Sequence, residues 1–161
     1  MGRDTSNQFI LIAHGKGFDA EAYLKTTTLT FDRVWKLGEP KYPGGDLLHE
    51  TSGVEKVLGD GRIIRPPEQE RMACDFLKAN RDSIRDLASW PGADHRIIGL
   101  QYHIEFSPGI GGFCMAPSPS LMAAALEVGF RPTYYVTIDH VERRPRPTRI
   151  PSKPDSDGGA V

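Results

Sequence analysis

The fold follows from residues 18–40, FDAEAYLKTTTLTFDRVWKLGEP, because this stretch contains a short helix with recognisable ends and then a strand. Asp19 suits the helix N-cap, since its carboxylate accepts hydrogen bonds from free backbone amides at the positive end of the helix. Phe18 and Tyr23 then occupy the two positions of a hydrophobic staple. Consecutive β-branched threonines at 26–28 predict the end of the helix.

A strand is predicted directly after this helix, over residues 31–37. Gly38 and Pro40 are structural residues that end it, because glycine adopts turn conformations and proline lacks a backbone donor. Trp35 has apolar neighbours and is expected to anchor the core. Stacking against a ligand is the alternative role for its ring.

A related pattern closes the chain between residues 117 and 139. Ser118 is the expected N-cap of a helix, Pro119 its first residue and Gly129 the structural residue that ends it. A strand over residues 133–139 follows. The chain therefore contains two strand–helix–strand units, each with its own helix-capping signals.

Two further strands are predicted from apolar patterns. Residues 8–13 are apolar on both sides, which is typical of a strand in the middle of a sheet. Residues 97–106 alternate with a period of two, so one side faces a core. The side chains predicted to be buried in this strand and in the last one are Ile98, Leu100, Tyr102, Ile104, Phe106, Tyr134, Val136 and Ile138.

The segment between the two units has two predicted elements. A small hairpin is expected over residues 54–58 and 62–65. One long helix follows from Pro67 to about Ala88, with an apolar stripe along one side, and Pro91-Gly92 ends it.

These elements predict an α+β fold, a two-layer sandwich built from two strand–helix–strand halves, with the helices on one face of a mixed or antiparallel sheet. We expect one domain over residues 1–142 and a disordered tail over residues 143–161, which is rich in Pro and Arg.

Composition narrows the class of protein. The chain has 161 residues, 39% of them hydrophobic and 25% charged, which is typical of a soluble globular protein. No apolar run is long enough to cross a membrane, and Cys74 and Cys114 are expected to be free thiols in a reducing cytoplasm. Residues 1–142 contain 15 Lys and Arg against 19 Asp and Glu, a net charge of −4. Residues 1–142, called the body here, therefore offer no basic surface for nucleic acid.

The segments 18–24, 33–40 and 117–138 resemble a bacterial domain-of-unknown-function family, the one numbered four-two-seven-nine. The strongest mark of this resemblance is Arg-Val-Trp-x-x-Gly-Glu-Pro at residues 33–40. The resemblance covers roughly residues 8–140 and implies the fold and a bacterial, cytosolic setting. It implies no known activity, although some such domains neutralise toxins or accompany them.

The face of the sheet away from the helices is the candidate functional surface. Tyrosine among polar groups offers both contact area and hydrogen bonds to a protein partner. An ordinary solvated face is the simplest alternative. The side chains expected on this face are Gln101, His103, Glu105, Tyr135, Thr137 and Asp139.

The sequence therefore predicts a cytoplasmic protein that binds another protein, such as an antagonist of a toxin, or a second copy of itself. We expect no enzyme activity, no cofactor and no metal. The alternative is a small metal-dependent hydrolase that uses His103, Glu105 and Asp139, since imidazole and carboxylate ligands suit zinc or ferrous iron. Gly15 and Gly17 do not have the spacing of a phosphate-binding loop and are expected to allow positive φ in turns.

Overall fold

The computed structural model describes residues 8–59, 66–106 and 116–140, and at residues 66, 103–106 and 137–140 it describes the backbone alone. Three predictions lie outside the described residues: the second hairpin strand at 62–65, the free thiol of Cys114 and the disordered tail. Within the described part, no helix is long and apolar enough to cross a membrane.

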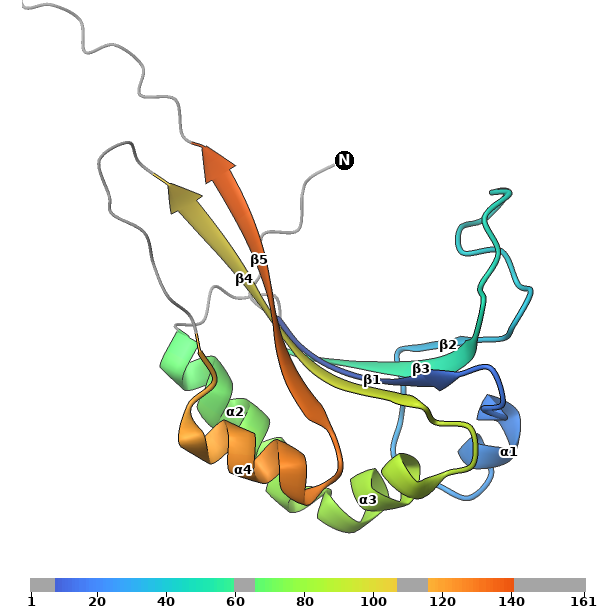
Figure 1. Ribbon diagram of the computed structural model, residues 1–161, viewed down its shortest axis with the longest axis horizontal. Helices are drawn as coiled ribbons and strands as arrows, with labels where there is room; N and C mark the ends of the chain where they lie inside the picture. Colours follow the sequence, from blue (N-terminus) through green and yellow to red (C-terminus); the bar gives the residue numbers. More distant parts are fainter. Residues whose placement is uncertain (1–7, 60–65, 107–115, 141–161) are drawn as a thin grey trace, which may run out of the picture.

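The described strands form one five-stranded sheet in the order β2-β3-β1-β4-β5 (Figure 1). The sheet is mixed, because β4 and β5 run parallel while all other neighbours run antiparallel. The prediction that the first strand is central is confirmed. The strands are β1 (Gln8–Gly15), β2 (Arg33–Trp35), β3 (Ser52–Leu58), β4 (His95–Phe106) and β5 (Arg131–His140).

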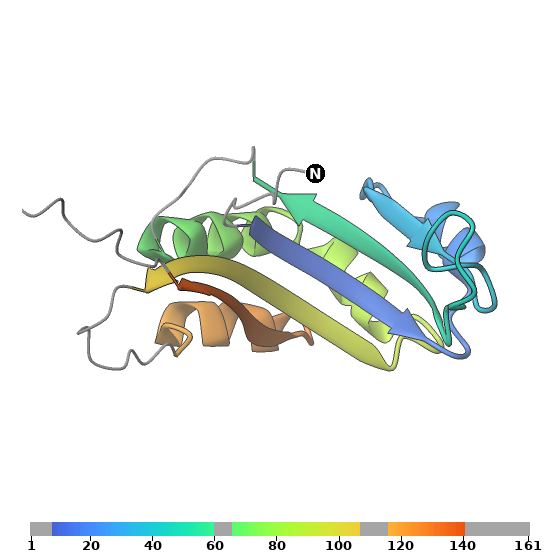
Figure 2. The same cartoon turned by 90° about the horizontal axis from the view of Figure 1, so that it is seen from above.

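Four helices pack against one face of this sheet, which confirms the predicted two-layer α+β fold. Viewed from above, the strands lie over the helices and no helix covers the near face (Figure 2). The sheet also bends, so that its uncovered face is concave (Figure 1). The helices are α1 (Ala20–Leu24), α2 (Pro66–Ala79), α3 (Arg81–Ser89) and α4 (Pro119–Glu127).

Both strand–helix–strand halves are present, but they differ in how their strands pair. In the C-terminal half, β5 pairs directly with β4 after α4. In the N-terminal half, β3 lies between β1 and β2 and pairs with both. The first strand of the predicted hairpin, residues 54–58, is thus part of β3, and its partners in the sheet are β1 and β2.

The predicted helix ends are confirmed in detail. The Asp19 carboxylate accepts a hydrogen bond from the Ala22 amide at 3.0 Å, and the Phe18 and Tyr23 rings of the staple lie 6.0 Å apart. At α4, Ser118 Oγ accepts from the Leu121 amide at 3.2 Å. Gly129 follows α4 with φ of 78°, where it favours the left-handed turn that ends a helix.

The prediction of one long helix is wrong, because the segment forms α2 and α3 with a break at Asn80. The Asn80 amide and side-chain Nδ2 both donate to the Phe76 carbonyl, at 3.0 and 2.9 Å. An asparagine side chain that bonds local backbone in this way competes with continuation of the helix. The apolar stripe nevertheless faces the core throughout, as Leu77, Ile84 and Leu87 are buried.

Two predictions about the strands also need correction. The strand predicted over residues 31–37 is only three residues long and lies at the edge of the sheet. Val136, predicted to be buried, is 38% exposed. Its strand is the other edge of the sheet, so the core covers Val136 on one side only.

The core lies between the sheet and the helices. Ile98, Leu100 and Tyr102 of β4 are buried there, as predicted. The side chains that are most completely buried come from almost every element, and they include Tyr23, Leu77, Ile84, Leu87, Leu121 and Phe130. This layer fixes the backbone of the sheet whose opposite face is described below.

The loop after β1 passes very close to the turn after α3. A Cβ atom on Gly15 would lie 1.8 Å from the Gly92 carbonyl oxygen, and one on Gly92 would lie 2.1 Å from the Gly17 carbonyl carbon. Gly92 has φ of 79°, whereas Gly15 and Gly17 do not have positive φ. The predicted positive φ is therefore wrong for both Gly15 and Gly17, and Gly15 has to be small because the Gly92 backbone touches it.

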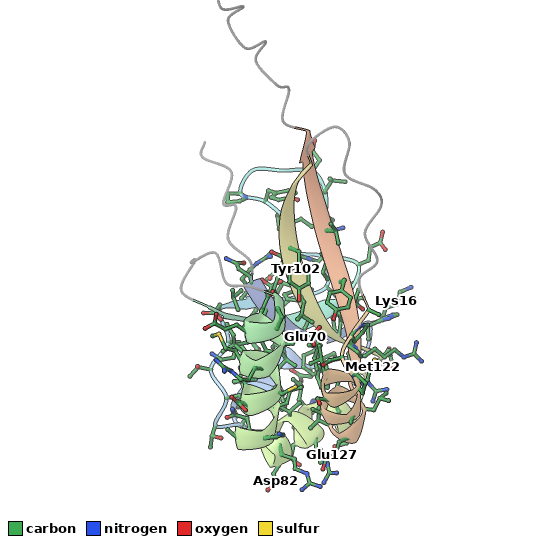
Figure 3. The ribbon with its side chains drawn as sticks, turned by 90° about the vertical axis from the view of Figure 1, so that its left-hand side faces the viewer. Lys16, Glu70, Asp82, Tyr102, Met122 and Glu127 are labelled. Atoms are coloured by element: carbon green, nitrogen blue, oxygen red, sulfur yellow. The ribbon has the colours of Figure 1, made fainter. Side chains whose placement is uncertain are left out.

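A carboxylate connects three elements near the start of α2, where Glu70 and Tyr102 lie close together (Figure 3). Tyr134 Oη donates to Glu70 Oε1 at 2.5 Å, and the Ser118 amide donates to Glu70 Oε2 at 3.3 Å. Burial, together with the hydrogen bond to Glu70 and the Glu70 charge, raises the pKa of the Tyr134 phenol. The phenol therefore stays a proton donor across the physiological range.

Candidate functional site

The uncovered side of the sheet, called the open face here, is defined by alternate residues of all five strands. The register places His14 of β1 opposite Gly53 of β3 and His95 of β4, and Trp35 of β2 opposite Gly53. The described side chains of the open face are Gln8, Ile10, Ile12, His14, Arg33, Trp35, Glu55, Val57, His95, Ile97, Gln101, Arg131, Thr133 and Tyr135.

Four rings form a continuous series across one end of the open face, and we call this series the aromatic row. The His95 and His14 rings stack with centroids 4.8 Å apart and planes 19° apart. His14 lies 6.4 Å from Trp35, and Trp35 stacks on His49 at 5.5 Å and 26°. The row runs from β4 across β1 and β2 to the loop before β3.

Glycine 53 provides the space for the Trp35 ring. A Cβ atom at this position would lie 2.2 Å from Trp35 Cζ2 and 2.6 Å from His14 Cβ. The indole therefore lies over β3 rather than in the core. The predicted role of Trp35 as a core anchor is wrong, because its strand is at the edge of the sheet and its ring lies on the open face.

The chain between β2 and β3, residues 36–51, forms an arm that rises at one end of the open face (Figure 1). Its two sides bond to each other: Gly38 N donates to His49 O at 2.8 Å, His49 N to Glu39 O at 2.8 Å, and Lys41 N to Leu47 O at 2.7 Å. Gly38 has φ of 82°, which confirms the predicted turn there. The arm is thus an ordered element.

Large apolar side chains of the arm face solvent. Tyr42 is 66% exposed and Leu47 65%, and Leu37 and Leu48 are also more than half exposed. An ordered loop that keeps apolar residues outside the core is typical of an interaction surface. The sequence predicted only a segment rich in Gly and Pro here, although Tyr42, Leu47 and Leu48 stand on either side of a Pro-Gly-Gly turn.

A hollow of about 380 Å³ lies between the arm and the aromatic row. Its charged groups are of both signs, and Arg33 Nη1 lies 3.5 Å from Glu55 Oε1 of the neighbouring strand. The residues that line it are Ile12, His14, Arg33, Trp35, Lys41, His49, Glu50, Thr51 and Glu55. The aromatic row forms one wall, so the hollow can receive a side chain from a partner.

The environment of His14 favours the neutral imidazole. Burial lowers its pKa most, the neighbouring His95 lowers it further, and Asp94 partly opposes both. Its Nδ1 is 3.2 Å from Thr51 Oγ1, which ties the ring to the base of the arm. Protonation of His14 therefore destabilises the folded state in which His14 stacks on His95.

This shift predicts how stability depends on pH. The folded state binds protons on His14 less readily than the unfolded state, whose pKa is near 6.5. The free energy of unfolding should therefore fall as the pH falls through 6.5. Urea unfolding followed by tryptophan fluorescence at pH 7.5, 6.5 and 5.5 measures this slope. We expect a shallower slope for His14→Gln, and an unchanged slope would contradict the assignment to His14.

The residues predicted from the sequence lie toward the other end of the open face. Gln101 and Tyr135 face each other in the register of β4 and β5, and Tyr135 is 42% exposed with its ring over Gly99. The side chains of His103, Glu105, Thr137 and Asp139 lie outside the described residues. The backbone register places His103 opposite Thr137 and Glu105 opposite Asp139.

Sequence reasoning did not find the histidines of the aromatic row. No role is predicted above for His14, His49 or His95. The signal was absent because the three residues are far apart in the chain and meet only through the pairing of β1 with β4 and β3. Among the described side chains, no group of three or more His, Cys, Asp or Glu is placed to hold a metal ion.

The chain matches no protein-family model, no curated protein and no solved structure. The resemblance to the domain-of-unknown-function family therefore stays a prediction.

Proposed function

We propose that this chain is a non-enzymatic binding protein whose open face and arm together receive another protein. The observation that carries the proposal is the arm, which is held by its own backbone hydrogen bonds and yet exposes Tyr42, Leu47 and Leu48. Keeping three large apolar side chains in water is unfavourable unless a partner covers them.

The shape of the surface supports a protein rather than a small molecule as the partner. The arm and the concave face border a broad area, whereas the hollow between them is only one part of it (Figure 1). Aromatic residues at the centre with polar residues around them are typical of protein interfaces. Trp35 and Tyr42 are the residues that we expect to contribute most, because Trp and Tyr dominate binding energy at such interfaces.

The charge of the body indicates which kind of protein it binds. With a net charge of −4 over residues 1–142, complementarity favours a partner with a basic surface. A protein that acts by covering its partner needs contact area and no catalytic group. We therefore propose the specific form of an antagonist that binds a basic toxin in the cytoplasm.

Single substitutions on this surface should weaken binding. Capture on the immobilised full chain from its own host identifies the partner, and calorimetry then measures Kd. We expect Trp35→Ala or Tyr42→Ala to raise Kd at least about ten-fold, the effect of losing an interface hot spot. Met72→Ala is the matched control, because Met72 is 42% exposed on α2, in the helix layer.

The outcome separates a real interface from a general loss of folding. Thermal unfolding of each variant shows that the fold is intact before binding is compared. The proposal is wrong if the partner binds Trp35→Ala and Tyr42→Ala as tightly as the natural chain, or if Met72→Ala weakens binding equally. The alternative, a metal-dependent hydrolase using His103, Glu105 and Asp139, predicts stoichiometric zinc or iron in elemental analysis of the purified protein.

A further inference from the structure

The outer edge of β5 is a second surface of interest. β5 is ten residues long, it is the last strand of the sheet, and among the described residues it pairs with β4 alone. A long unpaired edge strand offers a row of backbone donors and acceptors to another strand. Its charged residues Arg131 and Asp139 stand near the two ends of the strand, and Pro132 is its one position without a backbone donor.

The sequence of β5 is complementary to itself when it runs antiparallel to a second copy. With Tyr135 opposite Tyr135 of that copy, position 131 faces position 139, which is arginine facing aspartate. Position 133 then faces 137, threonine facing threonine, and position 134 faces 136, tyrosine facing valine. Cross-strand pairs of opposite charge and of aromatic with β-branched residues are the favourable ones.

The helix beneath this edge is also apolar on its free side. Ala124 and Val128 of α4 border a hollow shared with Leu77 of α2, which identifies the flank of α4 that faces α2. By helical spacing, Met122 and Leu126 lie on the opposite flank. They are 37% and 60% exposed.

Exposure of Val136 fits the same arrangement. Val136 is paired with Tyr102 of β4, and the Tyr102 side chain is buried in the core. Val136 therefore lies on the helix side of the sheet. It is nevertheless 38% exposed, because nothing described lies beyond the edge. In the antiparallel pairing, Tyr134 of the second copy would cover it.

We infer that two copies of this chain associate about a two-fold axis at Tyr135, joining their sheets through β5 and packing the free flanks of α4 together. A two-fold axis requires a surface that complements itself, and the pairs 131–139, 133–137 and 134–136 meet this requirement, while position 132 places a proline, which has no backbone donor, opposite Ile138. The inference does not depend on the proposed function, since Trp35 and the arm lie at the opposite end of the sheet.

The test is the mass of the full chain in solution, measured by light scattering after gel filtration and by sedimentation at 5–100 μM, on the order of concentrations used for weak dimers. We expect the natural chain to have twice the mass of one copy. Arg131→Asp and Asp139→Arg should each weaken the dimer at least about ten-fold, because like charges then face each other twice. Lys25→Glu, a charge reversal on the distant α1 end, is the matched control.

Mixing the two variants gives the sharpest result. The Arg131→Asp copy has aspartate at both positions 131 and 139, and the Asp139→Arg copy has arginine at both. In a mixed pair each aspartate therefore faces an arginine. The mixture should dimerise although neither variant does so alone. The double variant Arg131→Asp/Asp139→Arg should dimerise like the natural chain. The inference is overturned if the natural chain is monomeric at 100 μM, a concentration of about the order where such dimers form. It is also overturned if both single variants stay dimeric, or if two folded single variants do not associate on mixing.

Discussion

Replacing Gly92 by alanine should lower the free energy of unfolding by about 3 to 4 kcal/mol, and Tm by about 10 °C. The added Cβ would lie 2.1 Å from the Gly17 carbonyl carbon and 2.5 Å from the Phe18 amide nitrogen. Both are backbone atoms, so no side chain can rotate away. The loop after β1 would have to move, and it leads directly into α1.

Gly38 is the matched control for the backbone conformation of Gly92. Its φ of 82° is almost the same as the 79° of Gly92, but nothing lies within 4 Å of a Cβ added there. Gly38→Ala should therefore cost only the strain of a left-handed alanine, about 1 to 2 kcal/mol. Urea unfolding of both variants measures the difference. Equal losses would show that the close approach at Gly92 contributes nothing.

Replacing Glu70 by alanine should cost about 3 kcal/mol, because two hydrogen bonds to one carboxylate are lost together. The Tyr134 hydroxyl and the Ser118 amide would both lose their acceptor. Ser118 also caps α4, so the loss affects α2, α4 and β5 at once. Urea unfolding followed by circular dichroism measures the change.

A double-mutant cycle with Tyr134→Phe isolates the bond between the two side chains. We expect Tyr134→Phe alone to cost about 1 to 2 kcal/mol. The double variant should cost less than the sum of the single ones, because the bond can be lost only once. Additive losses would mean that Glu70 stabilises the protein through Ser118 alone.

Local sequence signals predicted the local structure well. Asp19, Ser118 and Gly129 mark helix ends through hydrogen bonds to residues within four positions, so the information lies in the motif itself. The alternation in β4 likewise identified the buried side of the strand. The break at Asn80 was missed because the apolar stripe of α2 continues into α3, and periodicity does not report a hydrogen bond that interrupts a helix.

The candidate site was predictable in part. The one-sided helix layer could be inferred from apolar patterns, and it places Gln101 and Tyr135 on the open face. The aromatic row could not be inferred, because Trp35 is an edge residue only if β3 pairs with β2. Likewise, His14 meets His95 only in the observed register. Residues brought together by long-range strand pairing leave no spacing pattern in the chain.

The position of β3 between β1 and β2 has a consequence for synthesis of the chain. β2, β3 and β1 pair among residues 8–58, so this part of the sheet can assemble on the ribosome before β4 has been made. Until β4 arrives, one side of β1 lacks its neighbour and is a site where nascent chains can aggregate. Helices α2 and α3 stand between β3 and β4 in the chain, so that side of β1 stays uncovered until both helices and β4 have been synthesised.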